Sequence, residues 1–256
     1  MAVVETEFDR GVLTVTLNDE ANRNALSNQL VSELVDTLDR ADSDPQVRVV
    51  VLTNSGRVFC AGANLSERSE PGQAPAAVRS PGELFGRFAR SPKPYVGRIA
   101  GHCVAGGMGL AAAMDVSIAV DDAKFGFTEV RIGVAPAVIS VVCLPKMRPA
   151  DARAAFLRGN RFSADEAVRL GIINAAVPAD RLDEEVRAVV DDLLAGGPNA
   201  IAASKQLLAQ VPYMQVDEAF AWTGRLSADL FGSDEAKEGM TAYLTKRQAS
   251  WVPQDD

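Results

Sequence analysis

The stretch HCVAGGMGLAAAMD, residues 102–115, places two adjacent glycines where a helix is expected to begin. Backbone N–H groups in the first turn of a helix have no partner within the helix and carry partial positive charge. Glycine lets a ligand approach the backbone closely, so Gly106 and Gly107 predict a loop that donates amides to an anion. Close packing of a helix on a sheet also requires small residues, and the stretch alone fits that explanation as well.

A second stretch of this kind, GRVFCAGANLSE at residues 56–67, places Ala61, Gly62 and Ala63 directly after a predicted strand. Two strand-to-turn loops can each direct one N–H group at the same carbonyl oxygen. Such an oxyanion hole is commonly the largest single contribution to catalysis of acyl transfer or enolate formation. The two stretches together therefore predict chemistry on a carbonyl compound, and neither contains the G-x-G-x-x-G of a dinucleotide site.

Other classes of chemistry find little support. The 256 residues include one histidine, His102, and neither H-E-x-x-H nor G-x-S-x-G occurs, so His102 is expected to line or support its loop. Three cysteines without C-x-x-C disfavour a disulfide framework or a metal site. A net charge of −8 without a basic block disfavours nucleic acid and membrane surfaces as partners. An acidic N-terminus without a long apolar run predicts a cytoplasmic enzyme or binding protein.

The elements that must position these loops are strands alternating with helices. Asp9-Arg10-Gly11 predicts a hairpin between two β-branched runs, and Ser27 is expected to cap a helix with Leu30, Leu34 and Leu38 on one face. Apolar runs that predict buried strands of a parallel-type sheet cover residues 47–53, 94–101 and 115–120. Asp115 is expected to tie loops together at a strand start.

The remaining sequence predicts a lid and a helical end. Residues 66–82 are rich in Pro, Gly, Ser and Glu and predict a long surface loop that could form a lid. The capping box at Ser163 opens a mainly helical part, with helices expected around 181–197, 198–210, 215–231 and 233–249. We therefore divide the chain into an α/β core at 1–190, holding the site, and a C-terminal helical region at 191–256.

Four stretches in fixed order carry a family resemblance: NRNAL (22–26), FCAGANL (59–65), AGGMGLAAAMD (105–115) and KFGFTEVRIGVAP (124–136). With KEGMTAYLTKR (237–247), they resemble the enoyl-CoA hydratase/isomerase (crotonase) superfamily from end to end. The resemblance implies an α/β spiral core of repeated ββα units with a C-terminal helical oligomerisation region. It also implies a homotrimer, or a hexamer built as a dimer of trimers.

By the same resemblance, the substrate is an acyl-CoA thioester, coenzyme A is part of that substrate, and no further cofactor is needed. Its carbonyl oxygen is expected between the N–H groups of Ala63 and Gly106. The other residues implied to contact the substrate or coenzyme A are Arg23, Ala25, Ala61, Asn64, Leu65, Tyr243 and Lys246. Of these, Tyr243 and Lys246 are expected to reach the site of a neighbouring subunit; a solvated cation at Arg23 and a plain helix face at Tyr243 and Lys246 are the alternatives.

The catalytic acids depart from the family pattern. Hydratases of the family commonly carry two glutamates that share a water; Glu129 matches the second, whereas Gly109 occupies the place of the first. The alternative for Glu129 is a loop carboxylate paired with Arg131 or Lys124. Three functions stay open: a 2-enoyl-CoA hydratase with one glutamate, an enoyl-CoA isomerase that uses Glu129 as its only proton shuttle, and a non-catalytic acyl-CoA-binding protein.

Overall fold

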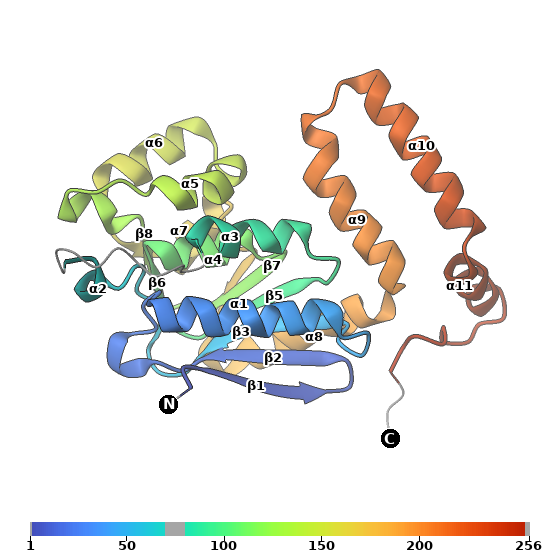
Figure 1. Cartoon of the computed structure of the whole chain (residues 1–256), viewed down its shortest axis with the longest axis horizontal. Helices are drawn as coiled ribbons and strands as arrows, with labels where there is room; N and C mark the ends of the chain where they lie inside the picture. The colour runs from blue at the N-terminus through green and yellow to red at the C-terminus, as the bar shows by residue number, and fades with distance from the viewer. Residues whose placement is uncertain (1, 70–79, 254–256) are drawn as a thin grey trace.

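The computed structural model describes residues 2–69 and 80–253, in which two sheets and a set of helices form the chain (Figure 1). The large sheet has the order β1-β2-β3-β5-β7-β10 and the small sheet the order β4-β6-β8-β9. The strands are β1 (Val4–Asp9), β2 (Val12–Leu17), β3 (Val49–Asn54), β4 (Val58–Cys60), β5 (Tyr95–Ile99), β6 (His102–Val104), β7 (Val116–Val120), β8 (Lys124–Gly126), β9 (Phe162–Ser163) and β10 (Ala175–Val177).

The helices surround the sheets and extend beyond them. They are α1 (Asn28–Ser43), α2 (Leu65–Ser69), α3 (Pro81–Arg90), α4 (Gly106–Ala113), α5 (Ala137–Cys143), α6 (Pro149–Arg158), α7 (Ala164–Arg169), α8 (Leu182–Ala195), α9 (Pro198–Gln210), α10 (Val216–Gly232) and α11 (Asp234–Leu244). Short 3-10 turns join them, among them η2 (Thr128–Ile132). In Figure 1 the helices α9–α11 reach away from the core, at the end opposite α2.

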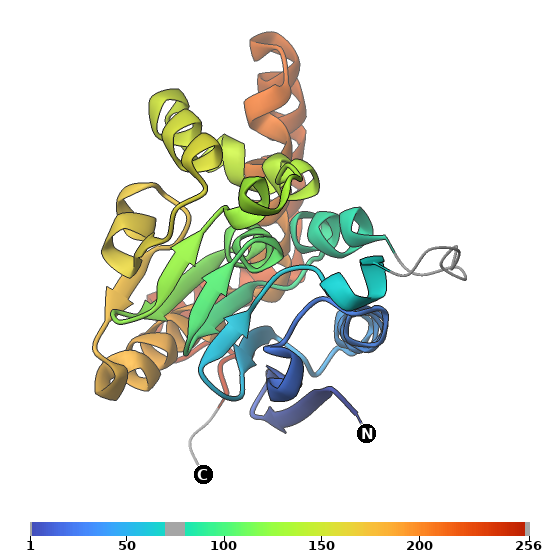
Figure 2. The ribbon, with the colours of Figure 1, turned by 90° about the vertical axis from the view of Figure 1, so that its left-hand side faces the viewer.

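A repeated ββα unit builds the core, as the resemblance implies. In the units that begin with β3, β5 and β7, the first strand joins the large sheet and the second strand joins the small one. The strands β3, β5 and β7 pair in parallel, as do β4, β6 and β8. The result is an α/β spiral, viewed from a second side in Figure 2.

The sequence patterns explain the main elements. Every residue of β3 is buried, because helices cover both faces of the large sheet. Ser27 caps α1 by accepting a hydrogen bond from the Leu30 N–H at 3.1 Å, and Leu30, Leu34 and Leu38 are fully buried. The predicted hairpin is also confirmed, since Arg10 and Gly11 both adopt the positive φ of its tight turn.

Three details differ from the sequence-based expectations. Residues 65–69 form α2, where Asn64 caps the helix, so the predicted loop begins later; the rest of that lid prediction at 70–79 lies outside the described residues. The part after residue 163 also contributes β10, which adds to the large sheet beside β7. The last helix ends at Leu244, before Lys246 adopts a positive φ of 55°.

Among the described residues, no helix has the length and apolar character that crossing a membrane requires.

The division at residue 190 falls inside α8, which packs on β3, β5 and β7 of the core. The division itself stays a prediction. Beyond α8, a partly buried ion pair anchors α9 to the core: Lys205 pairs with Asp115 at 2.5 Å and also donates to the Phe88 carbonyl oxygen at 2.9 Å. Asp115 further accepts a hydrogen bond from the Tyr95 N–H at 2.7 Å, which confirms its expected structural role at the start of β7.

Candidate active site

The small sheet gathers three loops at one edge. Its strands β4, β6 and β8 are neighbours and parallel, so their carboxyl ends point the same way. Ala63 and Glu129 lie three residues, and Gly106 two residues, beyond the last residue of their strands. Side chains and amides that follow neighbouring parallel strands meet at one edge, where α/β proteins commonly bind ligands.

The first loop is held from one side by the Arg23–Leu26 segment. The Ala61 N–H donates to the Arg23 carbonyl oxygen at 3.1 Å, and the Leu26 N–H donates to the Gly62 carbonyl oxygen at 2.7 Å. Gly62 has a φ of +91°, a conformation that only glycine adopts without strain. The Ala63 N–H has no acceptor among the described residues, and Ala63 is exposed, so this amide is available to a ligand.

The second loop lies directly against the first. A Cβ atom added to Gly62 would lie 3.0 Å from the Gly106 nitrogen, and one added to Gly106 would lie 3.2 Å from the Gly62 Cα. Gly106 begins α4, and in the described part of the chain nothing accepts from its N–H group. The two predicted amide donors therefore belong to touching loops, with both N–H groups unpaired.

Glu129 follows on the third strand, within η2. Its Oε2 atom is buried and has no hydrogen-bond partner in the part of the chain that the structure describes. Burial raises the pKa of this carboxyl above its ordinary value, and a hydrogen bond with its own backbone opposes the shift only in part. No ion pair joins Glu129 to Arg131 or Lys124 among the described residues, so the alternative of a paired loop carboxylate does not hold.

The raised pKa predicts the acid limb of the pH–rate profile. Only the carboxylate form of Glu129 can accept a proton, and a raised pKa means that this form is lost at a higher pH than for an ordinary glutamate. We expect kcat to fall as the pH drops, with a midpoint above 4.5, the ordinary value. Steady-state rates between pH 4 and 9 measure this midpoint. A midpoint at or below 4.5 would contradict the role of a buried Glu129 carboxylate in the reaction.

Gly109 is enclosed by apolar side chains. A Cβ atom there would lie 2.4 Å from Ile139 Cγ2 and 2.9 Å from the Phe85 ring, and both side chains are buried. The helices α3, α4 and α5 thus meet at this position without space for a carboxylate. Leu84, Phe85 and Phe88 of α3 are all buried, and Phe85 packs over Gly109. Ile139 went unrecognised, because nothing in its spacing predicts this contact.

We expect Gly109→Ala to destabilise the protein. Alanine favours a helix by about 1 kcal/mol over glycine, whereas overpacking a core costs about 1–3 kcal/mol, and contacts of 2.4 and 2.9 Å place this site in the second case. The matched control is Gly82→Ala within α3, where an added Cβ would meet only Ser80 Oγ, at an ordinary contact distance of 3.8 Å, and should stabilise. Urea unfolding of both variants gives the comparison; a Gly109→Ala protein as stable as the wild type would show that the junction has spare volume.

The remaining predicted residues fall into two groups. Arg23, Ala25, Ala61, Asn64 and Leu65 all lie on or beside the first loop. Within that group, Asn64 uses its Oδ1 to accept the Ser66 N–H at 3.1 Å and is therefore engaged as a helix cap. Tyr243 is 84% exposed on α11, and Lys246 follows that helix. In Figure 1, α11 and α2 lie at opposite ends of the molecule, so one chain does not bring these two residues to the first loop.

Asn24 supports the first loop from within and was missed by the sequence-based site prediction. It is fully buried with a φ of 50°. Its Oδ1 accepts from the Asp19 N–H at 2.7 Å, and its Nδ2 donates to the Val58 carbonyl oxygen at 2.7 Å. Asn24 thereby joins the Arg23 segment to β4. Its residue type is the only indication of this role in the sequence, because asparagine tolerates a left-handed backbone conformation.

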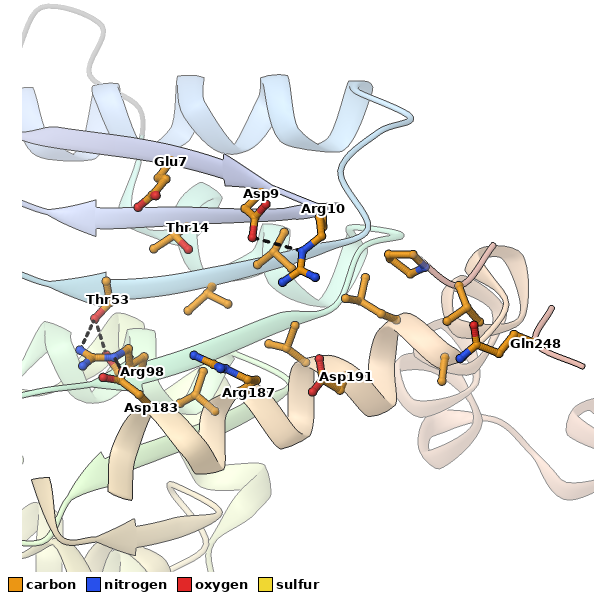
Figure 3. A pocket seen from close by; sticks show the side chains of 18 residues that line it. Glu7, Asp9, Arg10, Thr14, Thr53, Arg98, Asp183, Arg187, Asp191 and Gln248 are labelled. Carbon is orange, nitrogen blue, oxygen red and sulfur yellow. Dashed lines mark hydrogen bonds and ion pairs between the residues drawn. The ribbon is translucent and has the colours of Figure 1, made fainter. Parts of the chain in front are cut away.

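A large groove lies away from these loops. It measures about 980 Å³ and runs between α8 and the outer face of the large sheet (Figure 3). Figure 3 shows charged side chains along it, including Arg98, which pairs with Asp183 at 2.6 Å. None of the predicted site residues lines this groove, so volume alone does not identify the site here.

Comparisons with known proteins agree with this geometry. A family model described as enoyl-CoA hydratase/isomerase matches residues 7–254. The chain is 33% identical to enoyl-CoA hydratase EchA19 of Mycobacterium tuberculosis, covering 96% of this chain and 97% of that protein. It is 30% identical to 2,3-dehydroadipyl-CoA hydratase of Escherichia coli, covering 92% and 93%. The crystal structure of an enoyl-CoA hydratase from Mycobacterium smegmatis superposes with a TM-score of 0.89 at 30% identity, covering 97% and 98%. The chain therefore belongs to the enoyl-CoA hydratase/isomerase family.

Proposed function

We propose that this protein adds water to a 2-enoyl-CoA thioester, with Glu129 as its single acid and base. The observation that carries the proposal is the shared edge of β4, β6 and β8, where two unpaired amides and a half-buried carboxyl with an unpaired Oε2 atom follow neighbouring strands. The hydratase names of relatives at 30–33% identity over nearly the whole chain support water as the co-substrate.

The proposed reaction uses one proton twice. The Ala63 and Gly106 N–H groups hold the thioester oxygen, which stabilises the negative charge of an enolate. The Glu129 carboxylate takes a proton from water while the water oxygen bonds to C3, and the C2–C3 π electrons move toward the thioester oxygen. Glu129 then returns that proton to C2. A raised pKa suits the first step, because it makes the carboxylate a stronger base.

A second candidate is supported by the Gly109 junction. Since Phe85 and Ile139 fill that place, position 109 offers no carboxylate that could share a water with Glu129. An isomerase needs only one base, which removes a proton from C2 of a 3-enoyl-CoA and returns it at C4. The third candidate, an acyl-CoA-binding protein without turnover, would retain the two amides but would not depend on Glu129.

We also propose that the site is completed by assembly. The α10 helix has no buried residue, and Phe220 and Phe231 are 75% and 70% exposed. Exposed aromatic side chains along an unpartnered helix are typical of a subunit interface. A trimer or hexamer would cover them, and it would allow Tyr243 and Lys246 of one subunit to reach coenzyme A bound at Arg23 of another.

The test is an isotope experiment on two substrates. Purified protein is incubated with a short 2-enoyl-CoA in ¹⁸O-water and, separately, with a 3-enoyl-CoA, and the products are analysed by mass spectrometry. The proposal predicts a gain of one labelled water from the 2-enoyl-CoA. Conversion of the 3-enoyl to the 2-enoyl compound without oxygen uptake would instead establish the isomerase. Binding of both thioesters without any product would favour the non-catalytic protein.

A further inference from the structure

Ala105, the residue before Gly106, has a backbone conformation that alanine rarely adopts. Its φ is 49° and its ψ is −121°, at the N-cap position of α4. Residues with a Cβ atom are strained at such angles, and strain of this kind persists only where the surroundings impose it. Strained residues cluster where a backbone group has to be aimed.

Two hydrogen bonds impose the conformation. The Ala105 N–H donates to the Gly126 carbonyl oxygen of β8 at 2.9 Å, and the Ala105 carbonyl oxygen accepts the Met108 N–H at 2.9 Å. In a trans peptide, the C=O group and the following N–H group point in opposite directions. Because the Ala105 carbonyl is directed into the first turn of α4, the Gly106 N–H is directed away from it. The ψ angle of Ala105 therefore sets the aim of the predicted donor.

The Ala105 methyl group also touches the other loop. A Cβ atom added to Gly62 would lie 2.6 Å from Ala105 Cβ, so the methyl group lies against the Gly62 backbone. Gly62 is the residue directly before Ala63, the donor of the first loop. The methyl group is thus in contact with one amide-donating loop and belongs to the other.

We propose that Ala105 is a positioning residue for the oxyanion hole: its strained backbone aims the Gly106 N–H, and its methyl group fixes the spacing between the two donors. This inference rests on the proposed role of Ala63 and Gly106. Glycine at this position would relax the backbone and remove the spacer together. We therefore expect Ala105→Gly to raise the activation free energy of the reaction and to change the free energy of unfolding little.

The experiment compares Ala105→Gly with Ala105→Ser, which retains the Cβ atom and the strained backbone. Cinnamoyl-CoA, a chromophoric 2-enoyl thioester, serves as the probe, because polarisation of its carbonyl group by hydrogen bonds shifts its absorbance to longer wavelength on binding. We expect Ala105→Gly to lose at least about half of that shift and about tenfold in kcat, since small misplacement of a reacting group carries costs of this order. Its KM and melting temperature should stay close to those of the wild type, and Ala105→Ser should retain most of the shift.

Three results separate the possible failures. An Ala105→Gly protein with the full spectral shift and an unchanged kcat would overturn the role of Ala105 and leave the proposed function intact. Parallel losses of the shift, of thermal stability and of thioester affinity would reduce Ala105 to a folding role. Absence of any shift in the wild-type complex would overturn the oxyanion hole itself, and the inference with it. Ala113→Gly, at the far end of the same helix, is the control for a general weakening of α4.

Discussion

We expect the Glu129→Gln variant to lose about 10²–10⁴-fold in kcat, the range typical of a positioned general acid and base. Glutamine keeps the size and shape of the side chain but cannot take a proton from water. Because the thioester oxygen is held by backbone amides, substrate binding should be almost unaffected. The prediction that binding is unchanged is checked by measuring KM for a short 2-enoyl-CoA or the affinity for a saturated acyl-CoA.

The same variant is expected to fold more stably at neutral pH. The pKa of Glu129 is raised in the folded state, so its carboxylate form destabilises folding above that pKa and the cost disappears below 4.5, where the group is protonated in both states. Glutamine removes the charge but keeps a polar group in the same place, so the gain comes only from the partly buried charge, and with partial solvent access we expect at most about 1 kcal/mol. Urea unfolding at pH 7 and at pH 4 measures the gain and its disappearance.

The control for Glu129→Gln is Glu7→Gln, on the exposed part of β1. It makes the same chemical change away from the loops and should alter neither kcat nor the pH dependence. If Glu129→Gln kept wild-type turnover, Glu129 would not be the acid or base. If it lost activity and stability together, the side chain would be structural.

Gly62→Ala should reduce kcat by about 10²–10³-fold, the cost of losing one donor of an oxyanion hole. Gly62 has a φ of +91°, and the new methyl group would approach Ala105 Cβ to 2.6 Å. Relief requires the two loops to separate, and the N–H groups of Ala63 and Gly106 would then no longer meet on one oxygen. Backbone donors cannot be removed by changing their own side chains, so this substitution tests them indirectly.

Gly56→Ala supplies the matched control for the backbone conformation. Gly56 also has a positive φ of +70°, but its added methyl group would meet only the end of the exposed Glu20 side chain, which can rotate away. Both variants should lose about 1 kcal/mol of stability because alanine is unfavourable at positive φ, and Gly62→Ala should lose more because of its contact with Ala105. Only Gly62→Ala should lose turnover, and an equal loss in both variants would show that activity follows general stability.

The sequence predicted the parts of the fold whose signals are local. The Asp9-Arg10-Gly11 turn, the Ser27 cap and the buried, mainly apolar β3 each follow from residues adjacent in the chain, and all are confirmed. The capping box at Ser163 is confirmed as well, since Ser163 accepts the Glu166 N–H at 3.2 Å. By contrast, β4, β6 and β8 have only three residues each, too few for a periodic pattern, although they build the edge that carries the site.

The sequence indicated which residues belong to the candidate site, but not the contacts and the backbone strain that position them. The two glycine-containing loops and Glu129 are visible in the sequence, because each follows a strand and each combines residue types suited to one task. The contact between Gly109 and Ile139 joins two helices, and the contact between Gly62 and Ala105 joins two strand ends. Neither contact has a sequence signal. The strain at Ala105 is equally hidden, because alanine does not ordinarily indicate a positive φ.

The most direct test of the account is exchange of the C2 proton of a saturated acyl-CoA, followed by NMR in D₂O. The substrate cannot be hydrated or isomerised, so the measurement isolates proton transfer at C2, which both proposed reactions share. In the proposed step the C2–H bond breaks and the proton passes to the Glu129 carboxylate. The electron pair moves to the thioester oxygen, which Ala63 and Gly106 are proposed to hold. We expect the wild type to exchange the C2 proton, Glu129→Gln to exchange almost none, and Gly62→Ala to exchange it at a strongly reduced rate. Exchange at equal rates in the wild type and in Glu129→Gln, or binding of the thioester without exchange in any protein, would contradict it.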